Sequence, residues 1–121
     1  MIKLVFCCRR KQGMTREAFQ ARWLDLHGPL VRSLREHLPM MKRYVQSHTL
    51  PGPANEVLRA SRGTGEPYDG ITEVWFESLE AMGASDSQEA QAAAQRLLED
   101  EAEFIDFARS NVFVTEEHEI F

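Results

Sequence analysis

The chain has little of what marks secreted, membrane or nucleic-acid-binding proteins. Only two of its 121 residues are cysteines, and Cys7 and Cys8 are adjacent. On a strand their side chains point to opposite faces, which excludes an ordinary disulfide between them. No run approaches the roughly 20 apolar residues of a transmembrane helix. A formal net charge of -5 argues against general nucleic-acid binding, which needs a basic surface. We therefore expect a cytoplasmic protein in a reducing setting, with neither a membrane nor a nucleic acid as partner.

The length fits a single domain over residues 1–121 that buries about two thirds of the surface of its unfolded chain. The apolar residues 1–8 are too few for a signal peptide, and the basic residues Arg9-Arg10-Lys11 follow them. Two interpretations of this basic triplet stay open. It forms a solvated turn after a strand, or it binds a phosphate or another anionic ligand.

Apolar periodicity divides the chain into six elements. In chain order, the pattern predicts a strand at 2–8, a helix from 15 to 38, strands at 40–50 and 69–77, a helical region at 85–107 and a strand at 111–121. Thr15 is the expected N-cap of the first helix, and Ser85 or Asp86 opens the capping box of the second. Residues 51–67 lack apolar periodicity, so we expect a long and mobile or disordered loop there.

The order strand, helix, strand, strand, helix, strand is typical of a ferredoxin-like α+β fold with a four-stranded antiparallel sheet. In this topology both helices cover the same face of the sheet. The other face carries a mixture of apolar and polar side chains and lacks a cover. We therefore expect a homodimer in which the two sheets pack against each other.

His27 is the leading candidate for chemistry. Pro29 lacks an N–H and clashes with the carbonyl of Asp25 in a straight helix, so a break is expected at Gly28-Pro29. A histidine at this bend, one turn after Trp23, can face a cavity and act as general acid or base. Alternatively, it bonds a backbone carbonyl that the bend leaves free.

His48, Tyr44 and Asp69 complete the predicted catalytic set. His48 and Tyr44 share a strand face but stand about 13 Å apart, so they can line opposite ends of one cleft. The expected hairpin places Asp69 beside His48, where its carboxylate would orient the imidazole. An ordinary hydrogen bond within the hairpin is the alternative.

Four aromatic residues are candidates for the wall of a ligand cleft, and each is equally suited to the core: Phe19, Trp23, Trp75 and Phe76. The four histidines lack the short spacings of zinc sites, so no metal site is expected. Gly63-Thr64-Gly65 is no dinucleotide fingerprint, because a strand follows it where a helix is needed.

Six groups of residues, taken in order along the chain, form a further pattern. They are Arg9-Arg10-Lys11 with Gly13-Met14-Thr15 and Phe19; Trp23, Asp25 and His27-Gly28-Pro29-Leu30-Val31; Arg43-Tyr44-Val45-Gln46 with His48; Tyr68-Asp69-Gly70 with Glu73, Trp75 and Phe76; Glu101, Phe104-Ile105-Asp106 and Arg109-Ser110; and Val114-Thr115-Glu116-Glu117-His118. The ordered set resembles the EthD family, named for ethyl tert-butyl ether degradation, within the dimeric α+β barrel superfamily. Residues 60–66 depart from it as a Gly- and Arg-rich insertion.

The resemblance implies a dimeric α+β barrel and an association with oxidative degradation of small organic molecules. Related fungal proteins are described as dehydratases, and similar barrels act as cofactor-free cyclases, isomerases or oxygenases, while some bind haem. We expect an enzyme that performs acid/base chemistry, namely dehydration, cyclisation, isomerisation or an associated oxidation, on a hydrophobic or aromatic, polyketide-like compound and needs no cofactor. The alternative is a non-catalytic carrier or accessory subunit that supplies a hydrophobic ligand, or haem, to an oxygenase.

Overall fold

A four-stranded antiparallel sheet forms the centre of the computed structural model, which describes residues 1–84 and 87–121. Its strands are β1 (Ile2–Cys8), β2 (Arg43–His48), β3 (Gly70–Phe76) and β4 (Asn111–Glu116), in the spatial order β2-β3-β1-β4. All three pairs are antiparallel. The ferredoxin-like α+β prediction is confirmed, although β2 and β4 are shorter than the predicted 40–50 and 111–121.

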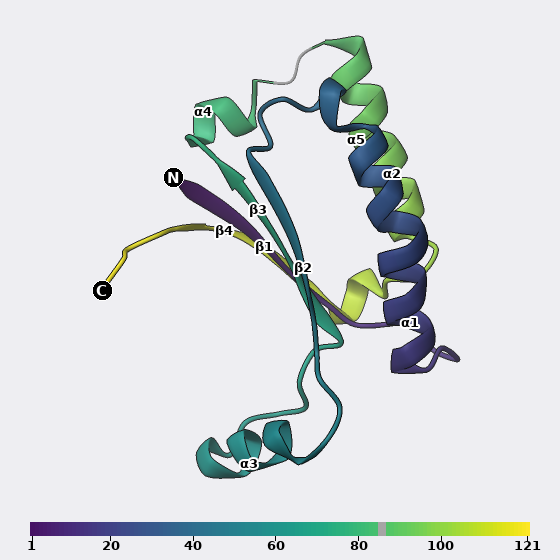
Figure 1. Cartoon of the computed structure of the whole chain (residues 1–121), viewed down its shortest axis with the longest axis vertical. Helices are drawn as coiled ribbons and strands as arrows, with labels where there is room; N and C mark the ends of the chain where they lie inside the picture. Colours follow the sequence, from purple (N-terminus) through teal and green to yellow (C-terminus); the bar gives the residue numbers. More distant parts are fainter. Residues whose placement is uncertain (85–86) are drawn as a thin grey trace.

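Strand alternation decides which side chains face the helices. In β3, Thr72, Val74 and Phe76 are buried on one face, whereas Ile71 and Trp75 of the other face are partly exposed. The helices on the covered face are α1 (Arg16–Arg22), a π-helical turn η1 (Trp23–His27), α2 (Gly28–Ser33) and α5 (Gln88–Glu101). Figure 1 shows all of them on one side of the sheet and none on the other.

The predicted break at Gly28-Pro29 is a π-helical turn inside a continuous helical path. The N–H of Gly28 donates to the carbonyl of Trp23, one residue beyond the α-helical partner, and Pro29 then occupies the first turn of α2. The wider turn accommodates a proline that has no N–H to donate. The helix is therefore not broken, but His27 still stands at its irregular turn, as the last residue of η1.

Tilted aromatic rings hold the first helix against the rest of the core. Phe19 lies between Trp23 and Phe104, with ring centroids 5.5 and 5.6 Å away, and all three side chains are fully buried. Pairs of this kind contribute about 0.5–1.5 kcal/mol each beyond burial of their area. Thr15 accepts a hydrogen bond from the N–H of Ala18, which confirms the predicted N-cap.

The mobile or disordered loop predicted at 51–67 is wrong for most of its length, because α3 (Pro53–Arg62) forms there. Proline in the first turn and Gly63 at φ 64° after the last turn mark its two ends. No residue of α3 is buried, and Val57 is 66% exposed. The helix extends away from the sheet (Figure 1), so the short apolar face formed by Val57 and Leu58 remains exposed.

Short elements complete the fold: η2 (Arg35–His37), α4 (Leu79–Met82) and η3 (Phe107–Arg109). Ser85 and Asp86, the predicted caps of the second long helix, lie outside the described residues. Ser87 accepts from the N–H of Ala90 at the start of α5. Within the described part of the chain, no helix is both long and apolar enough to cross a membrane.

Candidate active site in an apolar cavity

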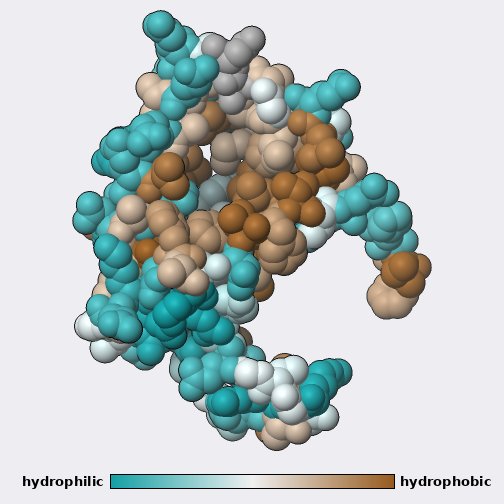
Figure 2. All heavy atoms as spheres, turned by 180° about the vertical axis from the view of Figure 1, so that it is seen from behind, coloured by the Kyte–Doolittle hydropathy of each residue, from teal (hydrophilic) through white to brown (hydrophobic). Residues whose placement is uncertain are grey.

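An apolar cavity of about 500 Å³ lies between the sheet and its covering helices. Figure 2 shows hydrophobic side chains gathered around a hollow on this side of the molecule. Its walls come from β1, β2, β3, β4, η1, α4 and α5 and from the segments that lead into β2 and β4. The polar side chains among its lining residues are His27, Tyr44, Thr72, Glu101 and Ser110. A few polar groups in an apolar wall are typical of sites for small hydrophobic molecules.

His27 is buried in this wall, with 2% of its surface exposed. Its Nδ1 lies 2.7 Å from Oδ2 of Asp100 in α5, and its ring meets Phe104 edge-on at 5.3 Å between centroids. An ionised carboxylate only accepts hydrogen bonds, so Nδ1 carries the proton and donates it to Asp100. Nε2 of the neutral ring is then an acceptor. This arrangement suits a general base.

Asp100 is held in its ionised form by the groups around it. Arg22 donates to both carboxylate oxygens, at 3.2 and 2.7 Å. These bonds, with the one from His27, outweigh burial and lower the pKa of Asp100 to about 2. Burial lowers the pKa of His27, although the Asp100 carboxylate opposes this shift. The imidazole is therefore mainly neutral at pH 7.

Glu101 brings a second titratable group to the cavity. Its Oε2 lies 4.0 Å from Nε2 of His27, and 23% of its side chain is exposed. Burial, with a smaller contribution from the charge of Asp100, raises the pKa of Glu101 to about 7. Near neutral pH this carboxyl group exists in both forms. It can therefore give or take a proton beside the histidine.

Tyr44 supplies a hydroxyl group to the same cavity. Burial raises the pKa of Tyr44 to about 12, so its phenol stays protonated and remains a hydrogen-bond donor. Trp23 also lines the cavity, and its buried indole N–H has no hydrogen-bond partner in the described residues. An unpaired buried donor costs about 1–3 kcal/mol, and a polar atom of a ligand would remove this cost.

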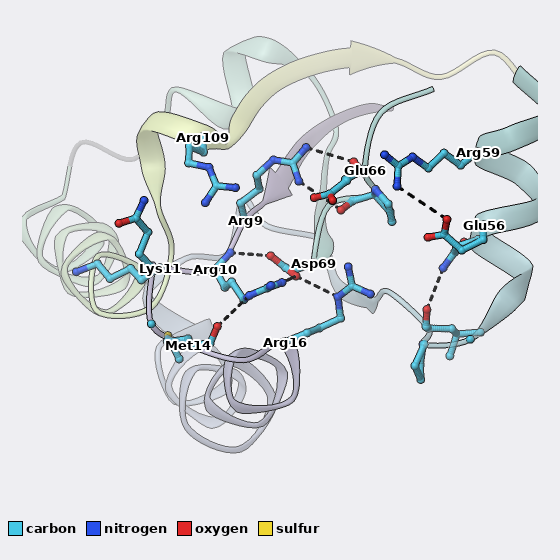
Figure 3. Close-up of a pocket in the computed structure, with 17 residues that line it drawn as sticks. Arg9, Arg10, Lys11, Met14, Arg16, Glu56, Arg59, Glu66, Asp69 and Arg109 are labelled. Carbon is cyan, nitrogen blue, oxygen red and sulfur yellow. Dashed lines mark hydrogen bonds and ion pairs between the residues drawn. The ribbon is translucent and has the colours of Figure 1, made fainter. Parts of the chain in front are cut away.

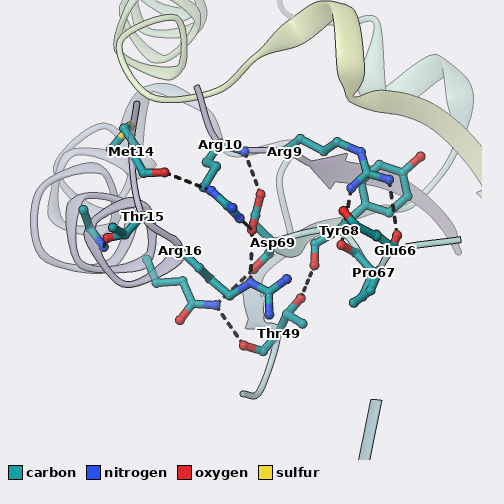
Figure 4. Close-up of polar contacts among 12 residues, drawn as sticks. Arg9, Arg10, Met14, Thr15, Arg16, Thr49, Glu66, Pro67, Tyr68 and Asp69 are labelled. Carbon is teal, nitrogen blue, oxygen red and sulfur yellow. Dashed lines mark hydrogen bonds and ion pairs between the residues drawn. The ribbon is translucent and has the colours of Figure 1, made fainter. Parts of the chain in front are cut away.

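The predicted partnership between His48 and Asp69 is wrong. His48 is paired with Gly70 in the sheet, but its Nε2 bonds Oε1 of Gln46 at 2.9 Å. The imidazole stacks on Trp23, with 4.6 Å between ring centroids. The carboxylate of Asp69 turns away to the side chains of two arginines (Figure 4). Neither His48 nor Asp69 lines the apolar cavity, whereas the predicted His27 and Tyr44 do.

The four predicted aromatic residues have different places. Trp23 and Phe76 line the apolar cavity, whereas Phe19 belongs to the core behind Trp23. Trp75 lies on the other face of the sheet, because alternation puts Phe76 and Trp75 on opposite sides. Lys3 lies 5.3 Å from the Trp75 ring centroid. Trp75 is therefore no part of this cavity.

Asp100 and Glu101 were missed as functional candidates, although α5 carries a signal for both. Ala90, Ala93 and Leu97 mark its buried stripe at helical spacing, and continuing that stripe reaches positions 100 and 101. Two acidic residues at the end of an apolar stripe are unusual, because isolated buried carboxylates are costly.

The described residues contain no group of three or more His, Cys, Asp or Glu side chains placed to hold a metal ion. A second cavity, lined largely by charged side chains, lies at the end of the sheet where Arg10, Asp69 and Arg16 meet (Figure 3). It holds the basic triplet of the sequence. Of the predicted catalytic residues, Asp69 lines this second cavity, whereas His27 and Tyr44 line the apolar one.

Solved structures share this fold at low sequence identity. An EthD family protein from Bacillus halodurans C-125 is 17% identical, with a TM-score of 0.62, over 98% of this chain and 99% of that one. An EthD-like protein from Ralstonia eutropha JMP134 is 18% identical, with a TM-score of 0.58, over 95% and 89%. A dimeric protein of unknown function with a ferredoxin-like fold, from Bacteroides fragilis NCTC 9343, is 11% identical, with a TM-score of 0.59, over 96% and 95%.

No curated protein sequence matches the chain significantly. The family model of the EthD domain, in contrast, matches residues 11–108. This range contains α1, η1, α2 and α5 of the covered face, the cavity-lining residues His27 and Glu101, and the strands β2 and β3. As the resemblance in its sequence predicted, the chain belongs to the EthD family.

Proposed function

We propose that this protein is an enzyme that moves protons on a hydrophobic small molecule bound in the apolar cavity. The observation that carries the proposal is a buried His27, fixed by Asp100, beside a Glu101 with a pKa of about 7. A neutral imidazole beside a carboxyl group whose pKa lies near neutrality is what general acid–base catalysis needs. The apolar walls suit an aromatic or polyketide-like substrate, and the cavity volume provides room for one.

The reaction class is a dehydration, cyclisation or isomerisation that needs no cofactor. In a dehydration, Nε2 of His27 takes the proton from the carbon beside a carbonyl, and the electron pair of that C–H bond forms the C=C bond. Glu101 in its acid form gives its proton to the departing hydroxyl group, which leaves as water. The imidazolium then returns a proton to the Glu101 carboxylate, so both groups regain their starting forms. Tyr44 donates a hydrogen bond to the substrate carbonyl oxygen as negative charge develops there.

Solvent deuterium exchange tests this mechanism without knowledge of the product. Candidate phenolic, polyketide-like and ether-degradation compounds are first screened by thermal shift, since a ligand at one hundred times its Kd adds about 2.7 kcal/mol. Exchange of C–H protons in D₂O is then followed by NMR for each compound that binds. His27→Gln should slow exchange by about 10² to 10⁴. Glu103→Gln, at an exposed glutamate two residues beyond Glu101, is the matched control for Glu101→Gln.

The second candidate is a carrier that binds a hydrophobic compound, or haem, for an oxygenase. The apolar character of the cavity supports it as well. A carrier would bind without catalysing exchange, and its affinity would tolerate His27→Gln while the aromatic wall remains. A purified protein with a Soret band would indicate the haem form. Binding with no exchange above the rate in buffer would contradict the enzyme proposal.

The uncovered face of the sheet favours a homodimer. Strand register places a set of apolar side chains on this face: Val5, Cys7, Val45, Ile71, Trp75 and Phe113. Structural neighbours from Bacteroides fragilis and Thermobifida fusca are described as dimeric. A second copy would cover this face, at about 800 Å² for each partner. Sedimentation equilibrium should give twice the monomer mass of 13.9 kDa, and a monomer at micromolar concentration would contradict the dimer.

A further inference from the structure

The second cavity differs from the apolar cavity in place and in chemistry. It has a volume of about 570 Å³ and lies between the end of the sheet and α3. Its charged lining consists of Arg9, Arg10, Lys11, Arg16, Arg59 and Arg109 with Glu56, Glu66 and Asp69. No described residue lines both cavities. We call it the cationic cavity, because six basic groups face three carboxylates in a chain whose net charge is -5.

Asp69 organises the floor of the cationic cavity. It is buried, with 3% of its surface exposed, and accepts from the backbone N–H of Arg10 at 2.8 Å. The side chains of Arg10 and Arg16 also donate to its Oδ1 (Figure 4). Burial alone would raise the pKa of Asp69, but these donors hold it below its usual value. One carboxylate thus fixes two guanidinium groups and neutralises only one of them.

Arginine donors remain available above this floor. Arg16 uses its Nε for Asp69, and its terminal nitrogens make no hydrogen bond to any described residue. In Figure 3 its guanidinium group is turned toward the open space before α3. Arg10 uses Nε for the carbonyl of Met14 and Nη1 for Asp69, which leaves Nη2. A guanidinium held in place by one side loses little freedom when its other side binds a ligand.

Arg9 and Arg109 add two further basic groups to the cavity. Arg9 donates to the backbone carbonyls of Glu66 and Pro67 and stacks on the Tyr68 ring, 4.2 Å from its centroid. Carbonyl groups hold the guanidinium in place but bring no negative charge. Arg109 faces Asp106 at 3.8 Å and is half exposed. Both side chains point into the same space in Figure 3.

The helix α3 provides the opposite wall. Arg59 lies across the cavity from the arginines of the body (Figure 3), and its contact with Glu56 is a long one of 3.9 Å. Basic groups on two sides of a cavity of this volume suit a molecule with more than one anionic group. This arrangement also gives a role to α3, none of whose residues is buried in the fold.

We propose that the cationic cavity binds a small multivalent oxyanion, a phosphate ester or a polycarboxylate, between Arg16 with its neighbours and Arg59 of α3. Phosphate and carboxylate share the chemistry that guanidinium groups recognise, namely oxygen atoms spaced for two parallel hydrogen bonds. The site is separate from the proton-transfer site of the apolar cavity. Of the two interpretations of the basic triplet Arg9-Arg10-Lys11, a solvated turn or an anion-binding site, the proposal adopts the anion-binding site.

Titration with inorganic phosphate and with citrate tests the proposal. Each is followed by two-dimensional NMR of the full-length protein in a phosphate-free buffer, with sodium chloride at matched ionic strength as the control. We expect saturable shifts at residues 9–16 and 53–66, and none with chloride. Arg16→Gln and Arg59→Gln should each weaken binding about tenfold or more, as expected for loss of a charge-assisted hydrogen bond. Arg62→Gln removes the same charge from α3 outside the cavity and should leave the Kd unchanged.

Each outcome has one meaning for the cationic cavity. Tighter binding of phosphate points to a phosphate ester, and tighter binding of citrate points to a polycarboxylate. Shifts that follow ionic strength alone, or the same loss of affinity in Arg59→Gln and Arg62→Gln, would overturn the proposal. So would the absence of saturation up to about 10 mM of both probes. If Arg16→Gln does not fold, Arg59→Gln still decides, because α3 stands outside the core.

Discussion

Glu101→Gln tests the electrostatics of the apolar cavity most directly. Burial raises the pKa of Glu101 from 4.5 to about 7 in the folded protein, whereas the unfolded chain keeps the ordinary value. Between these two values the folded state binds more protons than the unfolded state. The free energy of unfolding therefore falls as pH rises through this window. The shift corresponds to a loss of about 3 kcal/mol of folding stability. This loss is absent below pH 4.5 and complete above pH 7.

Urea unfolding at fixed protein concentration, measured from pH 4.5 to 8.5, provides the assay. Glutamine cannot ionise and has nearly the same volume, so Glu101→Gln should become more stable than the wild type by up to about 3 kcal/mol as pH rises. His27 titrates in both proteins, and its contribution cancels in the difference to first order. The Asp100 contribution is lost only as pH falls from 3.8 toward 2, below the measured range.

Two results would refute this reasoning. One is a constant difference between Glu101→Gln and the wild type over the whole range. The other is a ¹³C NMR titration in which the Glu101 carboxyl group ionises below about pH 5.5, as a solvated carboxyl group does. Glu103→Gln should keep the wild-type pH dependence, because its side chain is exposed. A change in that control as large as the change in Glu101→Gln would show that the cavity is not the cause.

Further predictions concern four residues in or near the two cavities. Gly70→Ala should destabilise the fold by about 1–3 kcal/mol in urea unfolding, because a Cβ there would stand 2.8 Å from the Ser47 carbonyl oxygen and closer to the Trp23 ring. Asp100→Asn should remove about 2 kcal/mol of stability above pH 4, and with it the acid-induced loss between pH 3.8 and 2 that the wild type shows. Asp69→Asn should lower the unfolding free energy by about 1–3 kcal/mol and weaken phosphate binding, as seen by NMR titration. His48→Gln should leave proton exchange within about twofold of the wild type, since a direct acid or base contributes 10²-fold or more.

The sheet and its covering helices could be predicted because their signals are local and periodic. Alternation in residues 2–8 and 69–77 assigned β1 and β3 nearly to their ends, and Thr15 began the first helix as expected. The segment that forms α3 has only a short apolar face, Ala54, Val57 and Leu58, and none of its residues is buried. Its ends are set by Pro53 and Gly63, residue types that equally mark a loop.

The candidate site was predicted only where the backbone fixes the direction of a side chain. Tyr44 lies in β2, where strand alternation gives its face, and His27 lies at the irregular turn that Pro29 predicts. Asp69 precedes β3 by one residue, so alternation does not decide where its carboxylate points. The side chains of Arg10, two residues after β1, and Arg16 of α1 bind it instead of His48. The predicted strand pairing thus placed Asp69 and His48 correctly at the same end of the sheet, but it gave the wrong hydrogen-bond partner for the Asp69 carboxylate.

Because the two cavities differ in character and share no described lining residue, each proposal can fail alone. The acidic partners of His27 are Asp100 and Glu101 of α5. The arginines of the cationic cavity instead lie around Asp69 and opposite α3. Arg59→Gln should therefore weaken citrate or phosphate binding and leave proton exchange unchanged, while His27→Gln should do the reverse. If both variants changed both measurements, the two cavities would be coupled through the sheet, and an oxyanion would act as a regulator of the apolar site. If Arg59→Gln altered exchange alone, the basic wall would belong to substrate binding, and the assignment of a separate oxyanion site would be wrong.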